Sequence, residues 1–467
     1  MVSITDYKGK TVHMIGIGGS SMSGLADMLV KEGYTVTGSD RTLSHAVEGL
    51  IEKGVKVYIG HDAQNVQGAD LLVYSAAIAA DNPERLEAKR LGIPEMERAE
   101  LLGQLMLGHE INICVSGAHG KTSTSSMIAE ALIDAGMDPA VSIGGRPITL
   151  GSGSRVGSGK AFVAEACEFH GSFLFMHPTV AVVLNIDEDH LDYYGDIEHI
   201  EQAFEQFLNL LPEDGTAVGW GGDERIMKIF SRLNRRKVTF GLKPDCDCFA
   251  SSLCYTEDGR GDFDIVFGGK VLGHVTLTTA GEFAVINALA AFAASYVAGA
   301  PAEALCRSLS DFAGVHRRFE LTSVTDGVSL YTDYGHNPPE MRAAVHVAVM
   351  RHPRRVIAVM QPHTYSRVKT LFEGYLTCTE EADITLVTDI CAAREKDPGD
   401  INSLMVVEGM KKHGVNAVYT PTFDDTEKYL RDIWQEGDLV ITMGCGDINL
   451  LNEQIRGHGD SKGKTEK

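Results

Sequence analysis

The sequence predicts an α/β protein of three domains, with a Rossmann-like domain at each end and a central parallel sheet that carries a small antiparallel insertion. Three observations predict this fold. The chain has 467 residues, more than one ordinary hydrophobic core can organise. Apolar runs of strand length alternate with helical patterns, which indicates parallel sheets covered by helices. Two glycine-rich turns each join such a strand to a helix.

The first domain is predicted over residues 1–107. A strand at 11–15, a helix at 22–31 and a second strand at 34–37 form its first unit, and a buried strand follows at 69–74. Each segment has the length and apolar pattern of its element. The alternation predicts a parallel sheet with covering helices.

The central domain is predicted over residues 108–316. It begins with a strand at 111–115, a loop at 116–120 and a helix from Thr122 to about Ala135. Its later segments are buried strands at 162–165 and 180–185, strands without helices from about 238 to 279, and an alanine-rich helix at 284–298. Strands that follow one another with Gly and Asp turns predict the antiparallel insertion, and alanine favours the helix.

The C-terminal domain is predicted over residues 317–457. Its parallel strands are expected at 328–332, 356–360, 384–388 and 439–442, with helices between them. The remaining residues, 458–467, are polar and charged, and we predict a disordered tail there.

The composition argues against several classes of protein. The net charge of −22 disfavours nucleic acid as a partner, because phosphate backbones need a basic surface. No apolar run reaches about 18 residues, and the segment from Met1 to Lys10 lacks a signal-peptide pattern. We therefore expect a cytoplasmic protein without membrane insertion. The nine cysteines are expected to be reduced, and the closely spaced Cys246, Cys248 and Cys254 fit no common zinc pattern.

The most specific motif is the loop from Cys114 to Ser123, which follows a predicted strand and opens a predicted helix. Its glycines let backbone amides turn toward a phosphate, and the helix N-terminus adds a partial positive charge. Lys121 can reach the β- and γ-phosphates of ATP, and Thr122 or Ser123 can ligate Mg²⁺. This context disfavours a plain turn with an exposed lysine, although Val115 stands where the general pattern has its first glycine. The predicted cofactor-binding residues are Gly117, Ala118, His119, Gly120, Lys121, Thr122 and Ser123, which make the central domain P-loop ATPase-like.

A second glycine-rich turn, from Gly16 to Gly24, has the G-x-G start of a dinucleotide-binding turn, but Ser21 replaces the third glycine. Asp40, after the second strand, could accept a ribose hydroxyl. Alone, the turn fits a dehydrogenase or a turn that binds nothing. A dehydrogenase would leave the Lys121 loop unexplained.

Carboxylates and a histidine follow two buried strands of the central domain, at Glu165–Glu168 and at Asn185–Asp192. Parallel sheets place ligands at the carboxyl ends of their strands, so Glu165 and His190 could hold Mg²⁺ beside the phosphates. By itself the second cluster would be interpreted as a solvated acidic turn.

Two arginines lie at the boundary of the C-terminal domain, in the segment Arg317–Glu320, and the segment Asp333–Pro339 follows a strand of that domain. An arginine at a domain junction can neutralise a transferring phosphate. A structural ion pair is the alternative role.

Together these motifs resemble those of the Mur ligases of peptidoglycan synthesis. Their order along the chain extends the resemblance from about Lys10 to Gly457. The most specific segments are Gly16–Gly24, Gly117–Thr122, Glu165–Glu168, Asn185–His190, Arg317–Glu320 and Asp333–His336. His119 and Phe204 match the alanine-adding branch of this family, whose later members have Asn at the first place and a modified lysine at the second.

The resemblance implies an ATP- and Mg²⁺-dependent ligase that joins L-alanine to UDP-N-acetylmuramate through an acyl phosphate. The first domain would hold the UDP-sugar, the central one ATP, and the C-terminal one the amino acid, in a monomer or homodimer. The implied catalytic residues are Lys121, His190 and Arg318, and the implied metal ligands are Thr122, Glu165 and His190. Further nucleotide contacts would come from Asn287, Arg318 and Asp333. Substrate contacts would come from Gly18, Gly19, Ser20, Ser21, Met22, Ser39, Asp40, Ser75 and His336.

The chain departs from the family pattern at three places. Ala284 replaces an asparagine, so an amide that would bind nucleotide is absent, while Asn337 replaces a histidine and Cys445 an alanine. Two other interpretations stay open: a ligase that attaches a recycled peptide to UDP-N-acetylmuramate, and a regulatory nucleotide-binding paralogue without catalysis. The Ala284 change favours the paralogue, whereas the intact N-terminal turn argues against the recycling ligase.

Overall fold

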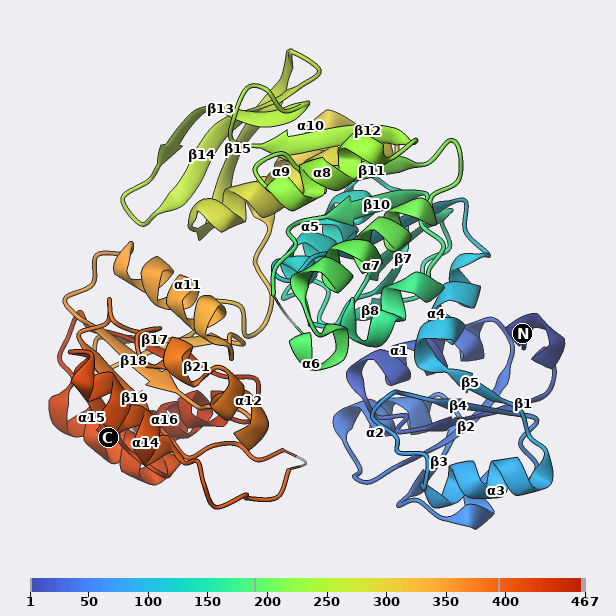
Figure 1. The fold of residues 1–467 in the computed structure, drawn as a ribbon, viewed down its shortest axis with the longest axis horizontal. Coiled ribbons are helices and arrows are strands. Elements are labelled where there is room, and N and C mark those ends of the chain that lie inside the picture. Colours follow the sequence, from blue (N-terminus) through green and yellow to red (C-terminus); the bar gives the residue numbers. More distant parts are fainter. Residues whose placement is uncertain (1, 189, 394, 463–467) are drawn as a thin grey trace. The chain divides into compact units, whose positions relative to one another are not determined.

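The computed structural model describes residues 2–188, 190–393 and 395–462. Within these residues the chain forms three sheets, coloured blue, green to yellow, and orange to red in Figure 1. The chain divides into two compact units: Met1–Cys254 with Asp262–Thr278 and Glu282–Ala313, and Gly314–Lys467 with Tyr255–Gly261 and Thr279–Gly281. The domain limits 1–107, 108–316 and 317–457 stay predictions, and each sheet lies within one of these ranges.

The first sheet has the strand order β3-β2-β1-β4-β5, with every pair parallel. This is the strand order of a Rossmann sheet, in which ligands bind at the carboxyl ends of the strands, at the point beside β1 where the strand order reverses. Its strands are β1 (Thr11–Ile15), β2 (Thr35–Asp40), β3 (Lys56–Ile59), β4 (Leu71–Tyr74) and β5 (Glu95–Glu97). Its helices are α1 (Ser20–Lys31), α2 (His45–Glu52), α3 (Pro83–Leu91) and α4 (Arg98–Met106).

The central sheet has the order β15-β14-β13-β12-β11-β10-β6-β9-β7-β8. Its middle strands are buried along nearly their whole length, as expected for parallel strands with helices on both faces. The strands are β6 (Ile111–Ser116), β7 (Ala140–Ser142), β8 (Ser154–Arg155), β9 (Ala161–Glu165), β10 (Val180–Val183), β11 (Thr216–Trp220), β12 (Arg236–Gly241), β13 (Cys248–Tyr255), β14 (Arg260–Phe267) and β15 (Lys270–Ala280). The helices are α5 (Lys121–Asp134), α6 (Leu191–Tyr194), α7 (Ile197–Asn209), α8 (Glu224–Arg232), α9 (Glu282–Val297) and α10 (Ala302–Asp311).

The antiparallel insertion predicted from about 238 to 279 corresponds only in part to β13, β14 and β15, which extend one edge of the central sheet. The prediction is wrong for its first strand, because β12 pairs in parallel with both β11 and β13. Only Gly268 and Gly269 separate β14 from β15, and so short a connection joins antiparallel neighbours, because parallel neighbours need a long crossover. The alanine-rich helix α9 then returns over the sheet and packs against α5, β11 and β12. Small side chains along α9 allow this close packing.

The third sheet has the order β16-β17-β21-β18-β19-β20, with β16 antiparallel to β17 and the other pairs parallel. Its strands are β16 (Glu320–Thr325), β17 (Val328–Asp333), β18 (Val356–Met360), β19 (Ile384–Val387), β20 (Ala417–Tyr419) and β21 (Leu439–Met443). Its helices are α11 (Pro338–Val349), α12 (Tyr365–Thr370), α13 (Phe372–Tyr375), α14 (Ser403–Lys412), α15 (Phe423–Ile433) and α16 (Asn449–Lys462).

The predicted α/β fold with a parallel central sheet is confirmed, and the predicted strands match β1, β2, β4, β6, β9, β10, β17, β18, β19 and β21 to within a few residues. Helix α16 extends into the range 458–467 of the predicted tail, and residues 463–467 lie outside the described part of the chain. Among the described residues, no helix combines the length and the apolar character needed to cross a bilayer.

Candidate active site

Three neighbouring strands of the central sheet direct their carboxyl ends toward one edge. Strand β6 pairs in parallel with β9 on one side and with β10 on the other. The segments that follow these strands include residues 117–120, 166–168, 184–188 and His190, and they contain parts of the predicted phosphate-binding, carboxylate and histidine motifs. The pairing explains why motifs about 70 residues apart in sequence meet, as expected for a ligand site of a parallel sheet.

The loop after β6 depends on its two glycines. Gly117 has a φ of 142° and Gly120 a φ of 84°, which are backbone conformations that other residues rarely adopt. A Cβ on Gly120 would lie 2.6 Å from Oδ1 of Asn287, so this residue of α9 lies directly against the loop. Gly120 also precedes α5 without providing a side-chain cap, which leaves the first-turn amides of the helix available to an anion.

Asn185 fastens the loop after β6 to the loop after β10. Its Oδ1 accepts from the backbone N–H of His119 at 2.8 Å, and its Nδ2 donates to the carbonyl of His119 at 3.0 Å. Nε2 of the His119 ring lies 3.7 Å from Oδ2 of Asp187, and the interaction with this imidazole lowers the pKa of Asp187 against the opposing effect of burial. The sequence motif contained Asn185, but its part in holding the loop was not predicted.

Lys121, at the start of α5, points back across its own loop. Its Nζ donates to the carbonyls of Gly117 at 2.5 Å and Ala118 at 3.2 Å, and to Oε1 of Glu168 at 2.9 Å. Burial, the largest single influence, disfavours the charged ammonium, but the charge and hydrogen bond of Glu168, together with Cys167 and Glu165, outweigh it and raise the pKa of Lys121 above its usual value. Lys121 is therefore a fixed cation at the position where the motif predicts phosphate contact.

Thr122 and Glu165 form a hydrogen-bonded pair of oxygen-bearing side chains beside Lys121. The Thr122 hydroxyl donates to Oε2 of Glu165 at 2.9 Å, and the amide of Gly144 donates to the same oxygen at 3.0 Å. A hydroxyl and a carboxylate are ligands that Mg²⁺ prefers, so these two residues fit the predicted metal.

His190, the third predicted ligand, lies on the loop after β10 with a φ of 55°, and its ring packs against Phe169 at 4.8 Å. The described residues contain no cluster of three or more His, Cys, Asp or Glu side chains arranged to hold a metal. The Thr122–Glu165 pair is thus in place, and the participation of His190 stays a prediction.

Glu168 belongs to this site, although no role was predicted for it from the sequence. Its side chain is almost completely buried, Oε1 accepts from Lys121, and Oε2 has no hydrogen-bond partner among the described residues. The motif Glu165–Glu168 was visible in the sequence, but the contact with Lys121 depends on the pairing of β6 with β9.

In the first sheet, the predicted substrate residues surround the turn after β1. Asp40 accepts from the amide of Gly18 at 2.9 Å, and Gly19 precedes α1. The hydroxyl of Ser21 accepts from Arg98 at 3.1 Å, whereas Met22 is buried in the hydrophobic core. The remaining predicted residues, Ser20 and Ser75, begin α1 and follow β4.

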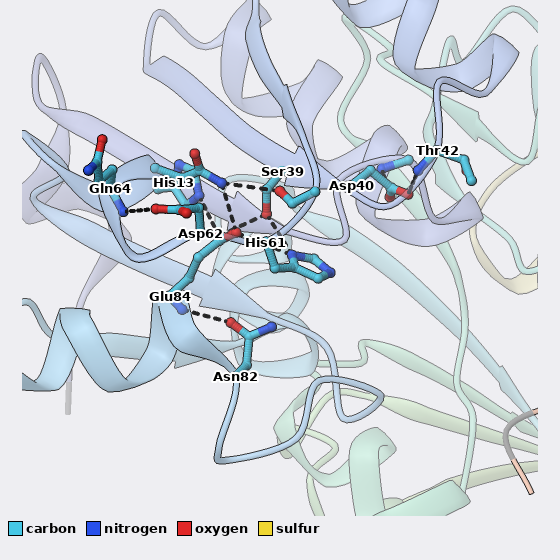
Figure 2. A network of polar contacts seen from close by, with 12 residues as sticks. His13, Ser39, Asp40, Thr42, His61, Asp62, Gln64, Asn82 and Glu84 are labelled. Atoms are coloured by element: carbon cyan, nitrogen blue, oxygen red, sulfur yellow. Dashed lines mark hydrogen bonds and ion pairs between the residues drawn. The ribbon is translucent and has the colours of Figure 1, made fainter.

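Ser39 is turned inward, toward a buried carboxylate that the sequence did not reveal. Figure 2 shows Glu84 reaching from α3 toward His13, Ser39 and His61. Oε2 of Glu84 accepts from Nε2 of His13 at 2.9 Å and from Ser39 at 2.8 Å. Oε1 accepts from Nδ1 of His61 at 3.2 Å and from Nδ2 of Asn65 at 3.1 Å. Burial opposes ionisation, but these donors outweigh it and lower the pKa of Glu84.

The only sequence signal for this network was the start of helix α3. Asn82 caps the helix by accepting from the amide of Glu84, and Pro83 occupies the first helical position. This pattern predicts the helix but not the destination of the Glu84 side chain, because its four donors come from distant segments.

The second unit contains Asp333, Arg318 and His336. Asp333 ends β17 and accepts from the amides of Phe319 at 2.8 Å and Gly335 at 2.7 Å. Burial raises its pKa, against the opposing charge of Arg318. The guanidinium of Arg318 lies over the ring of Tyr334 at 5.1 Å, and the amide of His336 donates to Glu340 at 3.1 Å.

Near the Lys121 loop, α9 presents Phe283, Ala284 and Asn287 from its first turns. Phe283 is 62% exposed, so its ring does not belong to the hydrophobic core. Its face is available for a planar ligand.

Three family models match successive parts of the chain. They are the Mur ligase family, catalytic domain, at residues 11–110; the Mur ligase middle domain at 115–295; and the Mur ligase, glutamate ligase domain, at 317–446. The chain belongs to the Mur ligase family. This Mur ligase is 43% identical to the UDP-N-acetylmuramate–L-alanine ligase of Caldanaerobacter subterraneus subsp. tengcongensis, over 96% of this chain and 97% of that protein.

A second relative of this Mur ligase is the UDP-N-acetylmuramate–L-alanine ligase of Acetivibrio thermocellus, with 42% identity over 97% of both chains. Among solved structures, the UDP-N-acetylmuramate–alanine ligase of Thermotoga maritima matches with a TM-score of 0.82 and 24% identity, over 97% of this chain and 99% of that one. This likeness shows that the Mur ligase fold extends over nearly the whole chain.

Proposed function

We propose that this enzyme uses ATP to join L-alanine to the carboxylate of UDP-N-acetylmuramate, in the synthesis of the peptidoglycan precursor. The observation that carries the proposal is the loop at the end of β6, where Lys121 lies beside the Thr122–Glu165 pair. The full-length relatives with more than 40% identity bear the name of this activity, which supports the choice of substrates.

The reaction takes place in two steps. An oxygen of the muramyl carboxylate attacks the γ-phosphorus of ATP, the bond to the β-phosphate oxygen breaks, and ADP leaves with the electron pair. The amine of L-alanine then attacks the carbonyl carbon of the acyl phosphate, loses a proton, and the tetrahedral intermediate collapses by releasing phosphate. Each step moves negative charge onto phosphate oxygens, which fixed positive groups can stabilise.

The chain's residues have distinct roles in this proposal. Lys121 neutralises charge on the transferring phosphoryl group, and the amides of residues 117–123 bind the phosphates. Thr122, Glu165 and His190 would hold Mg²⁺, which neutralises phosphate oxygens when it is bound. Asn287 lies against Gly120 and would face the nucleotide.

The remaining predicted contacts come from the resemblance. Arg318 would contact phosphate, Asp333 the nucleotide and His336 a substrate. The UDP-sugar would bind at the turn after β1, through Gly18, Gly19, Ser20, Ser21 and neighbouring residues including Met22, Ser39, Asp40 and Ser75. Because the side chains of Ser39 and Met22 are turned inward, their contribution would come from the backbone.

The assembly state and the cellular compartment of the enzyme are also part of the proposed function. We infer a monomer or homodimer in the cytoplasm, where ATP and both substrates are available. Light scattering of the purified chain would measure its mass, and a trimer or larger assembly would contradict this inference.

A phosphate-release assay tests the proposed reaction. With UDP-N-acetylmuramate, ATP and Mg²⁺ present, adding L-alanine is expected to produce phosphate, with smaller rates for glycine and L-serine. A pocket separates amino acids that differ by one small group by about 1–3 kcal/mol, so the three rates are expected to differ by about 10- to 200-fold. The absence of phosphate release with every amino acid would contradict the proposal and favour the regulatory paralogue.

A further inference from the structure

Glu168 is a buried carboxylate, and one of its two oxygens has no hydrogen-bond partner among the described residues. Its residue exposure is 2%, Oε1 accepts from Lys121 at 2.9 Å, and Oε2 has no partner within the described part of the chain. Its backbone is firmly held, because its carbonyl accepts from the Tyr194 hydroxyl at 2.5 Å and from the Gly171 amide at 2.9 Å. A buried anionic oxygen without a donor is costly, so this arrangement requires a physical reason.

Lys121 has no spare proton in this arrangement. An ammonium has three N–H donors, and here they face the carbonyls of Gly117 and Ala118 and the carboxylate of Glu168. To donate to a phosphate, Lys121 must leave at least one of these acceptors. Glu168 is the only charged one of the three, so a phosphate competes with it for the same cation.

The charges around Lys121 make that exchange unfavourable for a bare nucleotide. A phosphate close enough to contact Nζ comes within a few ångströms of Glu168, whose charge repels it, and Glu165 lies on the same edge of the sheet. A divalent cation bound with the nucleotide reverses the sign of this interaction. The negative charge of Glu168 then interacts favourably with the positive charge of that ion.

We propose that Glu168 is a positioning residue that holds Lys121 in the free enzyme and makes ATP binding depend on the divalent metal ion. The inference rests on the proposed binding of ATP at the Lys121 loop. It gives Glu168 no role as a metal ligand or as a group that touches the reacting atoms. Its effect is electrostatic and acts on the choice between metal-bound and metal-free nucleotide.

Calorimetric titration of the full chain with ATP tests this proposal, once in excess Mg²⁺ and once in EDTA. The measured quantity is the ratio of the two dissociation constants. In Glu168→Gln, which retains the shape and one acceptor for Lys121, metal-free ATP is expected to bind at least about tenfold more tightly, because a nearby like charge is removed. The affinity for metal-bound ATP is expected to change less, so the ratio falls at least about tenfold.

Glu110→Gln is the matched control. Glu110 precedes β6 of the central sheet and forms an ion pair with Lys160 at 2.9 Å, and both side chains are exposed. In Glu110→Gln the ratio of the two dissociation constants is expected to stay unchanged. Glu168→Asp retains the charge and is expected to retain a wild-type-like ratio. Comparing Glu168→Gln with Glu168→Asp therefore separates the effect of the charge from the effect of packing.

A second comparison guards against a folding defect in Glu168→Gln. Lys121→Gln and the double variant Lys121→Gln/Glu168→Gln are both titrated with ATP in EDTA. The double variant is expected to bind metal-free ATP at least about tenfold more tightly than Lys121→Gln does. An unchanged ratio in Glu168→Gln, or an unchanged affinity in this second comparison, overturns the role of Glu168 while leaving the proposed function intact. A wild-type chain that binds no ATP with or without Mg²⁺ overturns both.

Discussion

Two buried carboxylates of the first unit, Glu84 on α3 and Glu168 in the loop after β9, differ in how many hydrogen bonds their surroundings donate to them. Glu84 accepts four hydrogen bonds, two on each oxygen, from His13, Ser39, His61 and Asn65. Glu168 accepts one, from the lysine that the proposed reaction requires, and its other oxygen has no partner among the described residues. The difference indicates that Glu84 fixes the first sheet and that Glu168 belongs to a site whose contacts change when a ligand binds.

The largest effect is expected from removing Glu84. Glu84→Ala leaves four buried donors without their acceptor, and breaking a buried charged network costs about 3–5 kcal/mol. Urea unfolding monitored by circular dichroism would measure the loss. Glu52→Ala, an exposed residue of α2, is the control and is expected to change stability by less than about 0.5 kcal/mol. A loss of less than about 1 kcal/mol for Glu84→Ala would remove the contrast between the two carboxylates.

The next effect concerns Lys121. Lys121→Ala is expected to fold and to lose at least about a hundredfold in turnover, the scale for one preorganised donor at a developing charge. The control is Lys160→Ala, an exposed lysine of the same unit, whose turnover should match the wild type. Wild-type turnover in a folded Lys121→Ala protein would contradict the assignment of the phosphate site.

The fold was largely predictable because its signals are local. Buried parallel strands such as β6 and β10 are short apolar runs, and α5 follows a glycine-rich turn. The Lys121 loop was predictable for the same reason, since one contiguous segment contains its glycines, its lysine and its threonine. The family resemblance then placed the remaining motifs.

The Glu84 network was not predictable, because its members are spread from His13 to Glu84 and only the sheet brings them together. The direction of Ser39 was missed for a related reason. A polar residue at the end of a buried strand can face a ligand or the interior, and here a buried acceptor lies on the interior side. Glu168 was visible in a motif, but its contact with Lys121 exists only once β9 lies beside β6.

The stability that Glu84 contributes is expected to depend on pH. The pKa of Glu84 is lowered in the folded protein, so its ionised form contributes stability above the unfolded pKa of about 4.3, and this stability is lost as the pH falls through the folded pKa. Glu84→Gln is expected to cost about 1.5–3 kcal/mol at pH 7, the scale for hydrogen bonds to a charged group. The difference from wild type should shrink as the pH falls below about 4.3. Unfolding curves measured from pH 7 to pH 3.5 that keep a constant difference would argue against a charged Glu84.

The smallest effect is expected at α9. Ala284→Asn restores one side-chain amide beside the loop, worth about 0.5–1.5 kcal/mol, so the KM for ATP should fall by up to about tenfold while turnover stays within a few-fold. Phe283→Ala should raise that KM, because the exposed ring offers a stacking face. Steady-state kinetics would measure both. Rescue of an otherwise inactive protein by Ala284→Asn would favour the regulatory paralogue.

The central claim is that ATP activates the muramyl carboxylate at the Lys121 loop, and isotope transfer tests it most directly. UDP-N-acetylmuramate labelled with ¹⁸O at both carboxylate oxygens is incubated with ATP, Mg²⁺, L-alanine and the enzyme, and the released phosphate is analysed by mass spectrometry. If the carboxylate attacks the γ-phosphorus, each phosphate formed with the product will contain one labelled oxygen. Ligated product accompanied by unlabelled phosphate would contradict the account.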